Sequence, residues 1–113
     1  MIGCAFDVFN ELGFGHQEKH YQKAFAISLE SKKIKYKEQV YTPLKFQDKV
    51  VGRQYFDFLI EDKVIVELKK DARFAKQHMD QVNNYLKVSE LQLAILINFS
   101  KDGVIYKRIL NVK

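Results

Sequence analysis

The sequence has little of the residues that would cross-link the chain or divide it. Its one cysteine is Cys4, so no disulfide can form within the chain, and a reducing compartment, the cytoplasm, is the expected location. The only proline is Pro43, and the five glycines form no linker-like stretch. We therefore expect residues 1–113 to be a single domain, and a hydrophobic fraction of 47% supplies a folded core and argues against disorder.

Other features are missing as well, and each absence excludes a class of protein. No apolar run approaches the roughly 18 residues of a membrane span, so no membrane partner is expected. Residues 1–12 carry two acids and no basic leader, unlike a signal peptide. No glycine-rich phosphate loop is present, which leaves nucleoside-triphosphate hydrolysis unsupported. The net charge of +5 favours a polyanionic partner such as DNA or RNA.

The few histidines do not form a zinc motif. His16 and His20 are four residues apart and would share a helical face, but neither the cysteine nor the third histidine falls at a ligand spacing. We therefore interpret both as surface residues and Cys4 as a core residue of the first helix.

The spacing of apolar residues predicts three helices, because such residues recur every three or four positions. The first covers about residues 2–12, ends at Gly13 and Gly15, and has an apolar face of Ile2, Ala5, Phe6, Phe9 and Leu12. The second covers about residues 17–31, with an inward stripe of Glu18, Tyr21, Phe25 and Ser28 or Leu29. The third covers about residues 72–88, with an apolar stripe of Ala75, Met79, Val82 and Leu86.

Extended segments account for most of the remaining chain. Alternating or nearly continuous apolar residues predict strands over residues 34–42, 44–46 with 50 onward, 54–60, 63–69, 91–99 and 104–112. Turns are expected at Asp48-Lys49 and Asp102-Gly103, and the last strand is expected at an edge of the sheet. The order of helices and strands predicts an α/β fold with a mixed sheet flanked by helices.

One predicted hairpin carries charged residues between apolar ones: Asp57 on the first strand and Glu67-Leu68-Lys69 on the second. A two-residue turn at 61–62 would pair Asp57 with Val66 and place the two carboxylates on opposite faces. A three-residue turn at 61–63 would pair Asp57 with Glu67. It would also gather on one face Phe56, Phe58, Ile60, Val64, Val66 and Leu68. The apolar pattern favours this second register, since a slip of one residue would mix the layers.

Two facing carboxylates repel each other unless a cation lies between them. Oxygen ligands suit Mg²⁺ or Mn²⁺, so Asp57 and Glu67 are candidate metal ligands. Lys69 projects on the same face as Glu67, where it would hold or activate a water beside a scissile phosphate. The alternative, from the residues alone, is a structural ion-paired cluster in which Lys69 bridges the two acids.

These residues also follow a known pattern. Asp57, nine intervening residues and then Glu67-Leu68-Lys69 resemble the core signature of the PD-(D/E)XK nuclease superfamily, with Phe56 in place of the proline. The upstream string Gly15-His16-Gln17-Glu18-Lys19-His20-Tyr21 matches Gly-x-x-Glu-x-x-Tyr, which names the GxxExxY family within that superfamily. Residues 62–69, 81–87 and 96–99 add further agreement, so the resemblance covers nearly the whole chain.

The resemblance implies a restriction-endonuclease-like core and a metal-dependent nuclease that hydrolyses phosphodiester bonds in DNA or RNA. It implies that Asp57 and Glu67 bind Mg²⁺ or Mn²⁺ and that Lys69 is the catalytic lysine. Glu18 would be the acid of the first core helix and would support a ligand or a second ion.

The third helix adds candidates to this site. Gln81 and Tyr85 match the Gln-x-x-x-Tyr element of some nuclease branches, and helical spacing places them on a stripe with Phe74 and His78. Arg73 and Lys76 follow the Glu67-x-Lys69 strand closely, so they are candidate contacts to nucleic acid.

The alternative function is a catalytically inactive nuclease-fold module that binds nucleic acid or protein, and a third possibility is a component that acts only with a partner chain. The intact set of acids and lysine favours the enzyme, whereas the small size of the chain favours the binding module. A homodimer would enlarge the footprint of so small a core.

Overall fold

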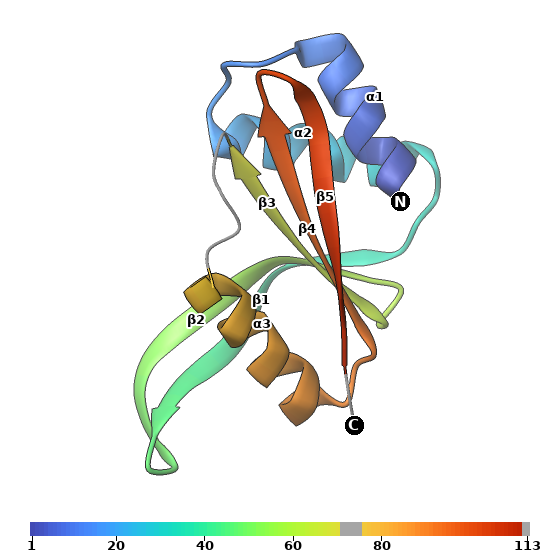
Figure 1. Cartoon of the computed structure of the whole chain (residues 1–113). Coiled ribbons are helices and arrows are strands. Elements are labelled where there is room, and N and C mark those ends of the chain that lie inside the picture. The colour runs from blue at the N-terminus through green and yellow to red at the C-terminus, as the bar shows by residue number, and fades with distance from the viewer. Residues whose placement is uncertain (71–75, 112–113) are drawn as a thin grey trace.

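The computed structural model describes residues 1–70 and 76–111. Within these ranges, helices α1 (Ile2–Leu12) and α2 (Glu18–Ser31) precede strands β1 (Tyr36–Phe46), β2 (Lys49–Ile60) and β3 (Val64–Lys70). Helix α3 (Lys76–Ser89) leads to strands β4 (Leu93–Ser100) and β5 (Gly103–Leu110), as Figure 1 shows. No helix in these ranges has both the length and the apolar character needed to cross a bilayer.

The five strands form one mixed sheet in the order β1-β2-β3-β4-β5. Neighbouring strands are antiparallel except β3 and β4, which are parallel because the connection through α3 returns the chain to the same end of the sheet. The predicted α/β fold with a mixed sheet is therefore confirmed, and β5 is the predicted edge strand.

Two apolar cores lie on the two faces of the sheet. The first packs α1 and α2 against the sheet and includes Tyr21, Phe25, Leu29, Phe58 and Phe99. The second packs α3 against the other face and includes Val82, Leu86, Ile65, Leu96 and Phe56, with Met79 beside it. The predicted inward stripes of α2 and α3 are confirmed at these positions.

The predicted face of α1 is wrong in part. Cys4, Ala5 and Val8 are its buried residues, whereas Phe6 is 42% exposed, so the buried face is rotated relative to the predicted one. Ile2 and Phe9 of the predicted face pack against the same core, so the prediction fails at Phe6 and Leu12, which lie at the exposed margin of the helix. The prediction that Cys4 is a core residue is confirmed.

The hairpin of β2 and β3 has the predicted register. Phe58 pairs with Val66 and Ile60 with Val64. The three-residue turn places Glu61 and Asp62 at φ values of 54° and 57°, and the Lys63 amide donates to the Ile60 carbonyl at 2.9 Å.

The prediction that one face of this hairpin gathers all its large apolar residues is wrong at Phe56. Phe58 packs against Phe25 of α2, but Phe56 packs against Tyr85 of α3 on the other side of the sheet, with ring centroids 4.7 Å apart. The change of side occurs at Asp57, where the facing residue of β1, Gln39, has a φ of 52° in the middle of a strand. The regular alternation of side chains is therefore interrupted between Phe56 and Phe58.

The hairpin of β1 and β2 is longer than predicted and projects beyond the rest of the sheet as an arm (Figure 1). We call residues 41–55 the arm. Its turn lies at Gln47 and Asp48, with φ values of 49° and 65°, one residue earlier than predicted. Both strands run without a break through the region where the sequence predicted separate segments.

Some predicted positions fall outside the described residues. The first turn of the predicted third helix, with Arg73, Phe74 and Ala75, is among them, as is Val112 at the end of the predicted last strand. The side chain of His78 is also outside the described part of the structure.

Tyr21 secures the loop between α1 and α2. Its hydroxyl donates to the Gly13 carbonyl at 2.6 Å and accepts from the His16 amide at 3.4 Å. Its ring, which is fully buried, stacks on Phe99 with centroids 4.4 Å apart. The side chain therefore joins the loop to β4 of the sheet.

We expect Tyr21→Phe to lower the free energy of unfolding by about 1–2 kcal/mol, because the ring stack is kept while both partly buried hydrogen bonds of the hydroxyl are lost. Urea denaturation followed by circular dichroism measures this change. Tyr41→Phe is the matched control, since Tyr41 is 49% exposed. Equal stability of the two variants would contradict the role given to the Tyr21 hydroxyl.

Candidate active site

The candidate site lies where β2 and β3 separate. Their regular pairing reaches Phe58 and Val66, and the next facing residues are Asp57 and Glu67. Here side chains replace backbone carbonyls as acceptors. The Asp57 amide donates to Glu67 Oε1 at 2.6 Å, and the Leu68 amide donates to Asp57 Oδ2 at 2.8 Å. The two carboxylates are therefore held side by side between the strands.

The charges in this pair interact strongly. Burial of Glu67, which is 6% exposed, raises its pKa to about 8, and the negative charge of Asp57 adds to this effect against the opposing influence of the Asp57 amide and of Lys69. Burial also raises the pKa of Asp57, against the opposing influence of the Leu68 amide and of Lys69. Glu67 therefore keeps its proton up to about pH 8, unless a cation at the site takes the place of that proton.

Glu18 reaches the same region from α2. It is the first residue of that helix, and its Oε1 accepts a hydrogen bond from the Lys70 amide at the end of β3, at 3.1 Å. Its negative charge acts on both Asp57 and Glu67. The three predicted acids are thus close enough to influence one another's pKa, and each of them accepts a hydrogen bond from a backbone amide.

Lys69 lies two residues after Glu67 on β3, and its positive charge opposes the rise in the pKa of both Asp57 and Glu67. In the described part of the chain, the ion pairs join Lys32 to Asp7 and both Lys35 and Lys37 to Asp62. None of these includes Lys69, which acts on the two acids through its charge.

Asn98 was not recognised from the sequence. In the parallel pairing of β3 and β4 it lies directly opposite Lys69, and its side chain is 6% exposed. It follows Ala94 and Leu96 on the face of β4 that packs toward α3. The sequence did carry one signal. Asn98 is a single polar residue in an otherwise apolar strand, and it alternates in step with Ala94 and Leu96, which face α3.

Gln81 and Tyr85 occupy a neighbouring place. They line a cleft between α3 and the arm, together with Gln54 and Asn84. The Tyr85 ring packs against Phe56, the residue before Asp57, and burial raises the pKa of its hydroxyl. These two residues therefore lie beside the strand that carries Asp57.

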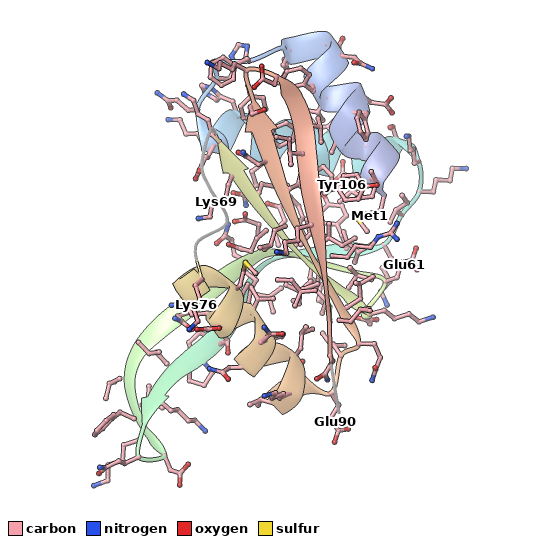
Figure 2. The ribbon with its side chains drawn as sticks, viewed as in Figure 1. Met1, Glu61, Lys69, Lys76, Glu90 and Tyr106 are labelled. Atoms are coloured by element: carbon pink, nitrogen blue, oxygen red, sulfur yellow. The ribbon has the colours of Figure 1, made fainter. Side chains whose placement is uncertain are left out.

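Of the two predicted basic contacts, the structure describes only Lys76. It is the first residue of α3 and is exposed. Figure 2 labels Lys69, near the end of β3, and Lys76, at the start of α3. Arg73 belongs to that segment and lies outside the described residues.

The donor atoms of the site fit a hard divalent cation. Among the residues that the structure describes, no three His, Cys, Asp or Glu side chains gather closely enough to hold a metal ion. The protein therefore offers the pair Asp57 and Glu67. Mg²⁺ suits such a pair, since it keeps several waters and binds through one or two carboxylates together with substrate phosphates.

Comparison with known proteins found a matching family model and a solved structure of similar fold. A family model described as the PD-(D/E)XK nuclease superfamily matches residues 1–109. A solved structure titled "Crystal structure of SSO0001" superposes with a TM-score of 0.63 at 16% identity, over 85% of this chain and 51% of that one, which shows a shared fold. The chain thus spans about half the length of that protein. No curated protein sequence matches. Because the family model covers nearly every residue, this chain belongs to the PD-(D/E)XK nuclease superfamily.

Proposed function

We propose that the protein is a metal-dependent nuclease that hydrolyses phosphodiester bonds in DNA or RNA. The observation that carries this proposal is the buried pair Asp57 and Glu67. Each of these side chains accepts a hydrogen bond from a backbone amide of the facing strand, and the charge of Lys69 acts on both. We also propose that it is a member of the GxxExxY group, on the string formed by Gly15, Glu18 and Tyr21.

In this proposal Asp57 and Glu67 hold Mg²⁺ or Mn²⁺. Such an ion, when bound, supplies positive charge to the scissile phosphate and lowers the pKa of a bound water. Glu18 supports this arrangement or a second ion, since its hydrogen bond to the Lys70 amide fixes the end of β3.

The remaining residues position the water and the substrate. Lys69 orients the attacking water, and Asn98, directly opposite on β4, limits where the lysine side chain can lie. Gln81 and Tyr85 position the phosphate or the metal ligands. Arg73 and Lys76 contact the nucleic-acid backbone as phosphate-binding cations.

One observation favours a second function, that of a catalytically inactive module that binds nucleic acid. Each of the three acids, Asp57, Glu67 and Glu18, accepts a hydrogen bond from a backbone amide. All three therefore have a structural role without a metal. Such a protein would bind DNA or RNA and show no cleavage with Mg²⁺ or Mn²⁺.

We expect Asp57→Asn and Glu67→Gln each to reduce Mg²⁺- or Mn²⁺-dependent cleavage by about a thousandfold or more, because a ligand charge is lost. The amide oxygens can still accept the backbone hydrogen bonds, so circular dichroism should show an unchanged fold. Cleavage is measured on labelled single-stranded and duplex DNA and RNA.

Glu61→Gln is the matched control for this experiment, since Glu61 is an exposed acid in the turn of the same hairpin. It should cut as the wild type does. Full activity in either site variant would overturn the site, and tight binding without any cleavage by the wild type would support the inactive module.

The affinity for Mg²⁺ should rise with pH up to about 8, because the raised pKa of Glu67 means that a proton occupies the site at lower pH and must be displaced. Between pH 6 and 7 the increase should be on the order of tenfold. Calorimetry in two buffers of different ionisation enthalpy measures both the affinity and the released proton. A pH-independent affinity with no proton release would contradict this linkage.

Without divalent cations, the same carboxyl should make stability depend on pH. Its pKa is about 8 in the folded chain and about 4.5 in the unfolded chain, so the folded state binds the proton more tightly. The contribution of Glu67 to the free energy of unfolding is complete below pH 4.5 and is lost as the pH rises through 8. Urea denaturation across this window should show the decline in the wild type and a smaller one in Glu67→Gln. Parallel curves would exclude Glu67 as the source.

A further inference from the structure

The cleft between the arm and α3 has the size and the lining of a small binding site. Its volume is about 260 Å³. Pockets for drug-sized ligands occupy roughly 300–1,000 Å³, so this cleft admits one planar ring system and its substituents but no double helix. Residues of both the arm and α3 line it, and Figure 1 shows these two elements next to each other.

The polar lining can recognise the edge of a nucleobase. Gln54 comes from β2, and Gln81 and Asn84 come from α3. Each amide side chain carries both donors and an acceptor, the combination with which proteins read base edges. Asn84 is exposed and Gln54 and Gln81 are half-buried, and all three side chains line the cleft, where a ligand could reach them.

The apolar lining can cover the face of a base. Leu44 of the arm and Val88 of α3 both line the cleft. Val88 is 86% exposed and Leu44 is 42% exposed, although both side chains are apolar. Contact with a flat ring would remove this apolar surface from water. Lys45, at the same cleft, supplies a positive charge for a neighbouring phosphate.

The cleft also lies next to the candidate active site. Tyr85 lines it and packs against Phe56, and Phe56 directly precedes Asp57. If a base sits in the cleft, the phosphodiester bond next to that nucleotide would therefore lie near Asp57 and Glu67. Because a base can enter so small a cleft only after it leaves the stack and its pairing partner, the base that enters must be unpaired.

We propose that this cleft binds one unpaired nucleobase next to the scissile bond, so that the substrate is single-stranded or locally unwound nucleic acid. The inference rests on the proposed nuclease function, and it adds Gln54 and Asn84 as residues that select the substrate.

Binding without cleavage tests the proposal. Fluorescence anisotropy with a labelled single-stranded DNA and with the same sequence as a duplex is measured in EDTA. The single strand should bind at least tenfold more tightly than the duplex. Gln54→Ala and Asn84→Ala should each weaken binding of the single strand by about tenfold, because a pair of hydrogen bonds to a base is lost.

Gln92→Ala is the matched control, since Gln92 is an exposed glutamine in the loop before β4 and does not line the cleft. Its binding should equal that of the wild type. Photo-cross-linking of a single strand that contains 5-iodouracil should label Tyr85. Labelling confined to Tyr41 or Tyr55, exposed rings of the arm that do not line the cleft, would overturn the proposal.

The outcomes separate this inference from the proposed function. Equal affinity for single strand and duplex, unaffected by the cleft variants, would overturn the cleft proposal even if Mg²⁺-dependent cleavage is observed. Selective binding of the single strand that depends on Gln54 and Asn84, with no cleavage under any metal, would support the cleft and reject the nuclease.

Discussion

The structure depends on the exchange of hydrogen bonds between two carboxylates and two backbone amides at the point where β2 leaves β3. Asp57 accepts from the Leu68 amide, and Glu67 accepts from the Asp57 amide. In a regular sheet, backbone carbonyls accept the hydrogen bonds of these amides, and leaving a buried amide without an acceptor would destabilise the fold. The carboxylates therefore let the strands separate without losing their hydrogen bonds, and the separation brings two acids together in a buried place. The pKa of about 8 for Glu67 is the electrostatic consequence.

The step at Asp57 also marks where the arm begins to leave the rest of the sheet. On one side of Asp57, β2 contributes Phe58 to the core under α1 and α2, and on the other it contributes Phe56 to the core under α3. Gln39 faces this step with a φ of 52°, a conformation that a residue with a side chain adopts at a cost of about 1–2 kcal/mol. That strain is located directly beside the acids, where strained backbone often accompanies function. The arm and α3 consequently face each other next to the site rather than far from it.

The register of the acidic hairpin could be predicted because several apolar residues constrained it at once. Of the two registers weighed, only one lets Phe58, Ile60, Val64 and Val66 share a face. The change of side at Phe56 could not be predicted in the same way, since alternation assumes a regular strand and the φ of Gln39 is set by tertiary contacts. The turn at Gln47 and Asp48 was placed one residue late because neither residue has the glycine signal of a tight hairpin.

Other parts of the site depend on partners far apart in the sequence, which a linear pattern does not supply. Asn98 became a candidate only through the pairing of β4 with β3, because its position in an apolar run indicated a buried strand and nothing more. Likewise, the spacing on α2 placed Glu18 on the inward side of the helix, but its hydrogen-bond partner is the amide of Lys70, which is 52 residues away in the sequence.

The Gly-x-x-Glu-x-x-Tyr string has a physical explanation in this fold. Gly15 has a φ of 102°, a backbone conformation suited to glycine, just before α2 begins. Glu18 opens the helix and reaches the end of β3, while Tyr21, three residues later on the same side, fastens the loop and stacks on Phe99 of β4. Spacing by three keeps the two side chains on one face of the helix. The string therefore sets the position of α2 against β3 and β4, and through Lys70 it sets the end of the strand on which Glu67 and Lys69 lie.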